Sequence, residues 1–191
     1  VLLVLKHSYQ FWYIITACHK MGVIPVPATY MLKPHDIEYR IEAANVKAAF
    51  VTIETDVSDS FDASSNIDKL SAKFIVNGKK DGWIDFDEAL EKQSEEWERV
   101  ETKVTDRMLM YFTSGTSGNP KMAVHDYSYP LGHIQLAKYW HQVDPDGLHL
   151  TISDTGWAKA MWGKIFGQWL CEAPIFVYDF DRFDAQDILP L

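Results

Sequence analysis

The chain has 191 residues, of which 47% are hydrophobic and 24% charged, so it is long enough and apolar enough to bury a substantial core as one or two domains. Its 18 basic and 27 acidic residues leave a formal net charge of −9, which argues against a nucleic-acid partner because binding to a polyphosphate backbone needs clustered Lys and Arg. No stretch is apolar for long enough to span a bilayer.

The first half of the chain predicts strands that alternate with helices. The expected strands are residues 1–5, 23–26, 48–53 and 73–76, and the expected helices are residues 9–21, 36–45 and 87–98. Ile37 and Ile41 fall on one face of the second helix, and Gly22 suits the end of the first. Residues 54–66 are polar and rich in Asp and Ser, and they predict no regular element.

The second half of the chain continues this alternation. Strands are expected at residues 108–112, 148–152 and 175–178, and helices at residues 128–141 and 157–170. Strands that alternate with helices are typical of an α/β protein with mostly parallel β-sheets flanked by helices. We therefore expect this fold class for the chain.

The cysteines and histidines do not predict a metal site. Cys18 and Cys171 lie far apart in apolar stretches and are expected to be reduced core residues. His125, His133 and His141 recur every eight residues, whereas two histidines that bind one metal from a helix face are three or four residues apart.

The run Tyr-Phe-Thr-Ser-Gly-Thr-Ser-Gly-Asn-Pro-Lys, residues 111–121, is the strongest functional signal in the sequence. Four hydroxyl side chains and two glycines fill positions 113–118, and Pro120 and Lys121 close the run. Glycines allow consecutive backbone N–H groups to point into one concavity, hydroxyls add donors, and the lysine adds a positive charge. This combination suits the phosphate chain of a nucleotide, and a flexible linker has no need of the Pro-Lys end.

Two common phosphate-binding motifs do not fit this run. A Walker A loop places its lysine directly after a glycine and before Ser or Thr, whereas Lys121 follows Pro120 and precedes Met122. Gly115 and Gly118 are three residues apart with no third glycine, so the run is not the dinucleotide fingerprint either.

Residues 112–121 instead resemble the phosphate-binding signature of the adenylate-forming, or AMP-binding, superfamily, which includes acyl-CoA synthetases, luciferases and the adenylation domains of peptide synthetases. The match is complete over these ten residues. Further resemblance lies in residues 22–29, 36–41, 81–83 and 182–189 and, most specifically, in Thr-Ile-Ser-Asp-Thr-Gly-Trp at residues 151–157, which looks like the medium-chain acyl-CoA synthetase branch.

The resemblance implies an acid–thiol ligase that works in two half-reactions. A carboxylate attacks the α-phosphate of ATP to give an acyl-adenylate and pyrophosphate, and coenzyme A thiolate then displaces AMP. ATP, Mg²⁺ and coenzyme A are the implied cofactors and co-substrates, and a small-molecule carboxylic acid is the implied partner. The residues implied to bind the phosphates are Thr113, Ser114, Gly115, Thr116, Ser117, Gly118, Asn119, Pro120 and Lys121.

Trp157 falls at a position that lines the acyl pocket in the branch resembled. Its indole ring would offer a flat apolar wall to an alkyl chain or aryl ring. The alternative is an ordinary core tryptophan at the start of a helix. Nearby Asp154 is expected to cap that helix rather than to act in catalysis.

We expect residues 1–191 to be an incomplete N-terminal AMP-binding domain that lacks the C-terminal domain. The chain opens inside an expected strand, and the family's adenine and ribose motifs do not occur in it. The residues that act directly in catalysis are therefore expected outside this sequence, and the chain alone is expected to be inactive. The expected compartment is the cytoplasm, or the mitochondrial matrix in a eukaryote, and assembly into a homo-oligomer stays open.

The sequence also allows one rival function and disfavours another. A non-catalytic module could bind a ligand or partner through its aromatic residues, which make up 14% of the chain. A kinase-like phosphate-binding enzyme is disfavoured because neither the Walker A nor the kinase pattern occurs.

Overall fold

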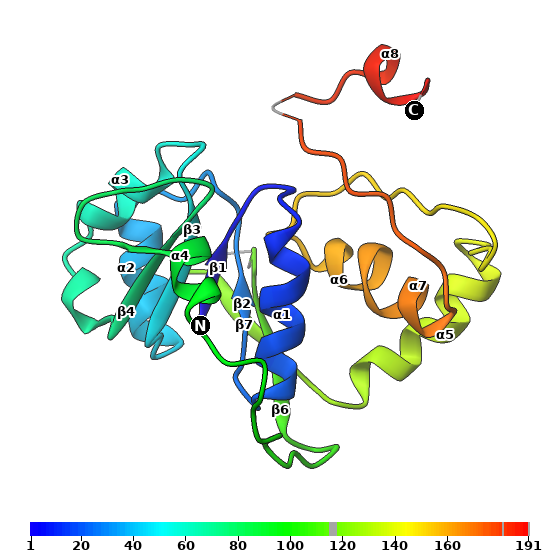
Figure 1. The fold of residues 1–191 in the computed structure, drawn as a ribbon, viewed down its shortest axis with the longest axis horizontal. Helices are drawn as coiled ribbons and strands as arrows, with labels where there is room; N and C mark the ends of the chain where they lie inside the picture. Colours follow the sequence, from blue (N-terminus) through cyan, green and yellow to red (C-terminus); the bar gives the residue numbers. More distant parts are fainter. Residues whose placement is uncertain (115–117, 181, 191) are drawn as a thin grey trace.

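The computed structural model describes residues 1–114, 118–180 and 182–190 (Figure 1). Its helices are α1 (Gln10–Lys20), α2 (Pro34–Ala43), α3 (Val57–Asp62), α4 (Phe86–Glu91), α5 (Tyr129–Tyr139), α6 (Ala158–Lys164), α7 (Phe166–Leu170) and α8 (Ala185–Ile188), with a 3-10 turn at Ile67–Lys69. Its strands are β1 (Leu2–Val4), β2 (Val26–Pro27), β3 (Ala48–Thr52), β4 (Ala72–Val76), β5 (Ile84–Asp85), β6 (Arg107–Thr113) and β7 (Lys121–Asp126).

Five strands form one parallel sheet in the order β2-β1-β3-β4-β5. Successive side chains of a strand point to opposite faces, so the segment that contains β1 contributes to two cores. Leu3 and Leu5 pack with residues of α1 and α4, whereas Leu2 and Val4 pack with residues of α2 and α3. Figure 1 shows α2 and α3 on one side of this sheet and α1 on the other. A parallel sheet covered on both faces confirms the expected α/β class.

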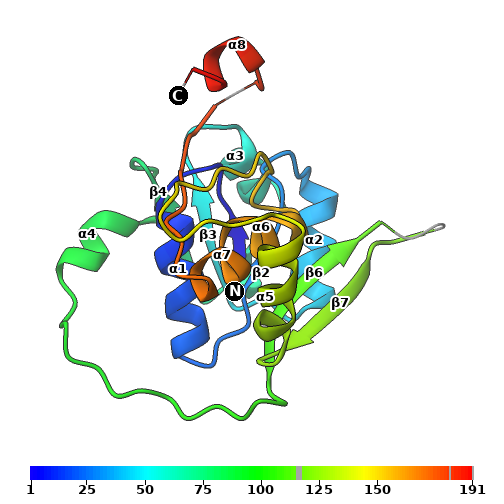
Figure 2. The same ribbon diagram turned by 90° about the vertical axis from the view of Figure 1, so that its right-hand side faces the viewer.

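The second sheet is the antiparallel hairpin of β6 and β7. The backbone N–H of Met110 donates to the carbonyl of Pro25 at 3.1 Å, which attaches β6 beside β2. Figure 2 shows the hairpin projecting away from the parallel sheet. The sequence did not predict β7, because Met122 and Val124 remain exposed and the strand depends on pairing with β6 rather than on burial of its own side chains.

The prediction of one helix over residues 157–170 is wrong. The helical conformation is interrupted at Ile165, where φ is −135° and ψ is −81°, and this interruption separates α6 from α7. Gly167 lets α7 approach α5 closely, since a Cβ at this position would lie 2.9 Å from the Cβ of Ala137. The indole N–H of Trp12 donates to the carbonyl of the last residue of α6 at 3.0 Å, which ties this helix to α1.

The two strands expected at residues 148–152 and 175–178 do not form. These segments meet only in one isolated parallel bridge between His149 and Ile175. Leu148 is 64% exposed, so the apolar residues that suggested a buried strand here do not all enter the core. Without a continuous neighbour to pair with, the segments stay irregular.

Two helix predictions also differ from the structure. The helix expected at residues 87–98 begins at Phe86 and ends at Glu91, because the residues that follow are exposed and offer no apolar face to bury. The polar segment 54–66 contains α3, whose Val57 and Phe61 are buried against the α2 side of the sheet.

The cysteine prediction is confirmed in its main point: Cys18 and Cys171 are both buried, and neither forms a disulfide. None of the helices in the described part of the chain is both long and apolar enough to cross a membrane.

Candidate functional site

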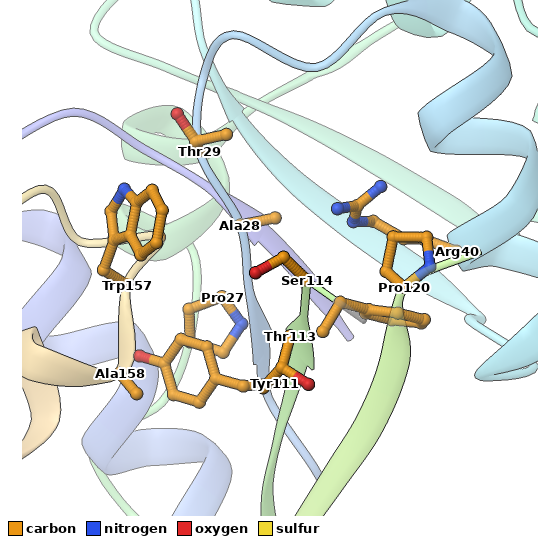
Figure 3. Close-up of a pocket in the computed structure, with 12 residues that line it drawn as sticks. Pro27, Ala28, Thr29, Arg40, Tyr111, Thr113, Ser114, Pro120, Trp157 and Ala158 are labelled. Carbon is orange, nitrogen blue, oxygen red and sulfur yellow. The ribbon is translucent and has the colours of Figure 1, made fainter. Parts of the chain in front are cut away.

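A cavity of about 310 Å³ lies where β6, the segment after β2 and the segment before α6 come together. The residues that line it are Pro27, Ala28, Thr29, Arg40, Tyr111, Phe112, Thr113, Ser114, Pro120, Gly156, Trp157 and Ala158. Figure 3 shows Trp157 and Ala158 at one end, which we call the tryptophan end, and Arg40 and Pro120 at the other, which we call the loop end. A concave space shared by elements far apart in sequence is the usual setting of a ligand site.

The loop end contains part of the predicted phosphate-binding run. Thr113, Ser114 and Pro120 line the cavity, and both hydroxyl residues are exposed at its surface. Gly118 has φ of +84°, a conformation that glycine adopts without strain. The remaining predicted members Gly115, Thr116 and Ser117 lie outside the described residues.

Two members of the run lie beside the cavity rather than in its lining. Asn119 and Lys121 are exposed, and Lys121 is the first residue of β7. The hydroxyl of Thr113 donates to the backbone carbonyl of Lys121 at 3.4 Å across the hairpin. Lys121 therefore lies on a strand of the hairpin rather than on a loop.

Helix α2 contacts the loop end through Tyr39 and Arg40. The hydroxyl of Tyr39 donates to the backbone carbonyl of Pro120 at 2.9 Å. The Tyr39 ring also meets the ring of Phe112 edge-on, with 5.8 Å between centroids, and the guanidinium of Arg40 lies 5.1 Å from the Phe112 centroid. These contacts fix both strands of the hairpin at the point where they enter the run.

The tryptophan end is built on a tight turn before α6. The backbone N–H of Gly156 donates to a carboxylate oxygen of Asp154 at 2.7 Å, and the N–H of Trp157 donates to the Asp154 carbonyl at 3.1 Å. The prediction that Asp154 caps the helix is therefore wrong, since α6 starts one turn later with no side-chain cap at Trp157. Burial raises the pKa of the Asp154 carboxyl above its ordinary value.

Gly156 allows this turn to dock on the segment that follows β2. A Cβ placed on Gly156 would overlap the backbone of Ala28 and Thr29. The hydroxyl of Thr155 holds the turn from the other side by donating to the backbone carbonyl of Leu5. The tryptophan end is thus part of the packed body of the fold.

Trp157 is 61% exposed. This exposure excludes the alternative of an ordinary core tryptophan within the described chain. Figure 3 shows its indole ring beside the cavity, above Ala158 and across from Ser114. An exposed aromatic ring at the edge of a cavity can cover an apolar ligand on one side.

Sequence reasoning missed Tyr111 and Arg40. Tyr111 is 2% exposed, lines the cavity, and its hydroxyl has no hydrogen-bond partner among the described residues. Burial raises the pKa of this phenol well above its ordinary value, so it stays protonated. The alternation of side chains along β6 placed Tyr111 on the same face as Thr113, which is a signal that the sequence offered.

The chain belongs to the AMP-binding enzyme family, because the family model described as AMP-binding enzyme matches residues 1–189. Among curated relatives, it is similar to the acyl-coenzyme A synthetase ACSM4, mitochondrial, of Mus musculus, with 36% identity over 99% of this chain and 33% of the relative. It is also similar to the acyl-coenzyme A synthetase ACSM3, mitochondrial, of Homo sapiens, with 33% identity over 99% of this chain and 32% of the relative. The chain thus spans about a third of the length of the curated relatives it matches.

Solved structures share the fold. The anthranilate CoA ligase AuaEII, crystallised in complex with anthranoyl-AMP, superposes with a TM-score of 0.88 and 20% identity over 98% of this chain and 36% of that chain. The acyl-CoA synthetase of Brucella canis superposes with a TM-score of 0.83 and 22% identity over 97% of this chain and 34% of that chain. These likenesses confirm the expected fold, that of the N-terminal domain of adenylate-forming ligases.

Proposed function

We propose that this chain is the N-terminal part of an ATP-dependent acyl-CoA synthetase that activates a small carboxylic acid. The observation that carries this proposal is the shared cavity: the ends of the Thr/Ser/Gly run and Trp157, predicted separately to bind phosphates and an acyl group, line one space. An acid must lie next to the α-phosphate of ATP to attack it, so a site for this reaction needs both kinds of wall side by side.

The loop end fits a phosphate chain. Thr113 and Ser114 present exposed hydroxyls, and no acidic side chain lines the cavity in the part of the chain that the structure describes. Backbone and hydroxyl donors from residues 113–118, with Asn119 and Pro120 completing the run, would hold the β- and γ-phosphates, and Lys121 would add a positive charge. Such preorganised donors stabilise charge that moves onto the leaving pyrophosphate.

Mg²⁺ is the metal that the family relationship implies. It would neutralise charge on the phosphate oxygens, and it commonly keeps several waters and few protein ligands. The described residues contain no group of three or more His, Cys, Asp or Glu side chains that could hold a metal. We assign the ion no protein ligand among the described residues.

The tryptophan end fits the acyl group of the acid. Pro27, Ala28 and Ala158 provide an apolar floor, and the ring of Trp157 stands at its edge. An acid bound there would have its chain against these side chains and its carboxylate toward Ser114. Coenzyme A would be the second substrate of the complete enzyme, and the groups that act directly in the transfer steps would lie outside these residues.

The names of the curated relatives include the word mitochondrial, which favours the mitochondrial matrix over the cytoplasm as the compartment. The rival function is a non-catalytic module that binds a ligand or partner. Both functions predict binding to the cavity, but only the synthetase predicts chemistry.

The test is acid-dependent exchange of labelled pyrophosphate into ATP by the longer protein that carries this chain. We expect exchange that requires a carboxylic acid and Mg²⁺, followed by thioester formation when coenzyme A is added. A folded protein that binds ATP but exchanges no pyrophosphate with a broad panel of acids would favour the non-catalytic module.

A further inference from the structure

Arg40 is the one charged side chain that lines the cavity in the described part of the chain. It comes from the middle of α2, where Ile37 and Ile41 point into the core, and it emerges at the loop end. Figure 3 shows its guanidinium beside Pro120 and Ser114, across the cavity from Trp157. Its position therefore differs from that of the surface charges on the rest of the helix.

Contacts within α2 hold the side chain of Arg40 in place, but not all of its N–H donors have a partner among the described residues. It is only 11% exposed, and one terminal nitrogen donates to the backbone carbonyl of Asp36 at 3.0 Å. The Asp36 carboxylate is 3.8 Å away, and its other oxygen accepts the N–H of Lys33 at the start of α2. The buried Nε of Arg40 has no hydrogen-bond partner among the described residues.

An arginine that served only to hold the fold would use its buried donors within the fold, because an unsatisfied buried donor is costly. Arg40 instead lines a cavity while its buried Nε has no partner among the described residues, and its guanidinium lies over the Phe112 ring. Burial lowers the pKa of Arg40, but a guanidinium keeps its charge at neutral pH. The group is thus a positioned cation at the cavity wall, and its hydrogen-bonding capacity is only partly used within the described residues.

Phosphate is the ligand chemistry that suits this arrangement. A guanidinium presents parallel N–H donors that match two phosphate oxygens, and such charged pairs are stronger than neutral hydrogen bonds. Arg40 stands beside the two ends of the run, Ser114 and Pro120, whereas the acyl group of the acid would lie nearer to Trp157. Tyr39, the preceding residue, already fixes Pro120, so α2 could position the run and contact its ligand together.

We propose that Arg40 is a phosphate-binding residue that contacts the nucleotide's phosphate chain from the α2 side of the loop end. The proposal rests on the proposed function for the identity of the nucleotide, and it adds a contact from an element outside the Thr/Ser/Gly run. It also gives α2 a direct part in the site.

The test compares Arg40→Gln, Arg40→Lys and Arg40→Met with Arg107→Gln in the longer protein. Arg107 is exposed at the far end of β6, so its variant makes the same change of charge away from the cavity. We expect Arg40→Gln and Arg40→Met to raise KM for ATP and for pyrophosphate by about tenfold or more, because a charged hydrogen bond is lost. Arg40→Lys should recover part of the effect, and the KM of the acid should stay within about twofold.

Arg40→Met keeps a long apolar side chain beside Phe112, so a role in packing alone predicts that it behaves like the wild type. An unchanged KM for ATP in folded Arg40→Gln would overturn the proposal. A rise in KM for the acid alone would assign Arg40 to the carboxylate and would overturn it as well.

A calorimetric titration with inorganic tripolyphosphate separates this proposal from the proposed function. If the wild-type protein exchanges no pyrophosphate with any acid, the proposed function fails, but weaker tripolyphosphate binding by Arg40→Gln than by Arg107→Gln still supports a phosphate contact. Equal binding by both variants, or no binding by the wild type, overturns it.

Discussion

The two ends of the cavity are built in different ways. The loop end lies on a projecting hairpin, where Thr113 and Ser114 are exposed and α2 provides support through Tyr39 and Arg40. The tryptophan end is a turn pressed into the body of the fold, where the backbone of Gly156 touches the segment after β2. The hydroxyl groups of the loop end therefore lie outside the hydrophobic core, whereas the turn of the tryptophan end packs directly against the body of the fold.

This difference determines how each end should respond to substitution. At the loop end, side chains can be removed without opening a cavity in the core, so activity and stability should change independently. At the tryptophan end, the turn at Gly156 is close-packed, so a change in that turn should alter both, whereas the exposed ring of Trp157 can be removed at a smaller cost in stability. The predictions below test this contrast, beginning with the largest expected effect.

The largest effect on activity is expected when the 191-residue chain is assayed without the rest of the longer protein. Residues 1–191 contain both ends, but they span only about a third of the length of the curated relatives. We expect the isolated 191-residue chain to form no acyl-CoA from ATP, Mg²⁺, coenzyme A and an acid, in an assay that detects thioester directly. Steady turnover by the purified chain would show that the two ends are sufficient and that no essential group is missing.

Gly156→Ala should cause the largest loss of stability. Its new Cβ would overlap the backbone of Ala28 and Thr29, which cannot move without shifting β2. We expect a loss of about 3 kcal/mol in the free energy of unfolding, measured by chemical denaturation, as for overpacked positions.

The matched control is Gly132→Ala. Gly132 lies in α5, and a Cβ there would meet no atom within 4 Å. Since alanine is a better helix former than glycine, this variant should gain up to about 1 kcal/mol. Similar stabilities for the two variants would contradict the view that the tryptophan end is pressed against the sheet.

Lys121→Ala tests the loop end. Lys121 is exposed on β7, so its removal should change the free energy of unfolding by less than about 0.5 kcal/mol. The rate of pyrophosphate exchange should fall about 100-fold if the ammonium group stabilises charge on the phosphates. The control is Lys138→Ala, because Lys138 is an exposed lysine on α5. If Lys121→Ala exchanges pyrophosphate as fast as this control, Lys121 does not contribute to phosphate binding.

The same contrast explains which parts of the site the sequence could predict. The donors of the loop end are contiguous in the chain, so their chemistry could be recognised without knowing the fold. Arg40 and Gly156 lie in segments that resemble the family, but each acts through neighbours that are distant in sequence, and the local sequence does not reveal those neighbours. Trp157 was found through family resemblance, but its exposure required the structure.

The same distinction applies to the helices and strands of the fold. The expected strands that match β1, β3 and β4 are apolar runs that are buried by their own helices, so hydrophobic patterning was sufficient. β7 exists because β6 is beside it, and the break at Ile165 separates α6, which Trp12 ties to α1, from α7, which lies close against α5. Patterning cannot reveal elements that depend on a partner's position.

Trp157→Ala should change substrate choice more than stability. Because Trp157 is 61% exposed, its truncation should cost less stability than that of a core tryptophan. Longer or bulkier acids should gain relative to short ones by roughly 1–3 kcal/mol for each methylene group that the enlarged pocket accepts. The measurement is the ratio of kcat/KM values across a series of acids, which cancels any common loss of folded enzyme.

The control for this prediction is Trp140→Ala, since Trp140 is 77% exposed at the end of α5 and does not line the cavity. It should leave the ratios unchanged. If the ratios for Trp157→Ala match those of this control, the ring does not limit the acyl pocket.

The smallest effect is expected from Asp154→Asn, which keeps an oxygen to accept the N–H of Gly156 but removes the charge. Burial raises the folded-state pKa of Asp154 above the ordinary 3.8, so the folded protein holds this proton more tightly than the unfolded chain. The resulting stabilisation is present below pH 3.8 and is lost as the pH rises through the folded pKa.

The Asp154→Asn variant should therefore be more stable relative to wild type at pH 7 than at pH 3, by about 1 kcal/mol, the ordinary size for one substitution. Denaturation of both proteins across this range gives the difference directly, and a difference that falls with rising pH would mean that the ionised oxygen holds the turn at a net gain.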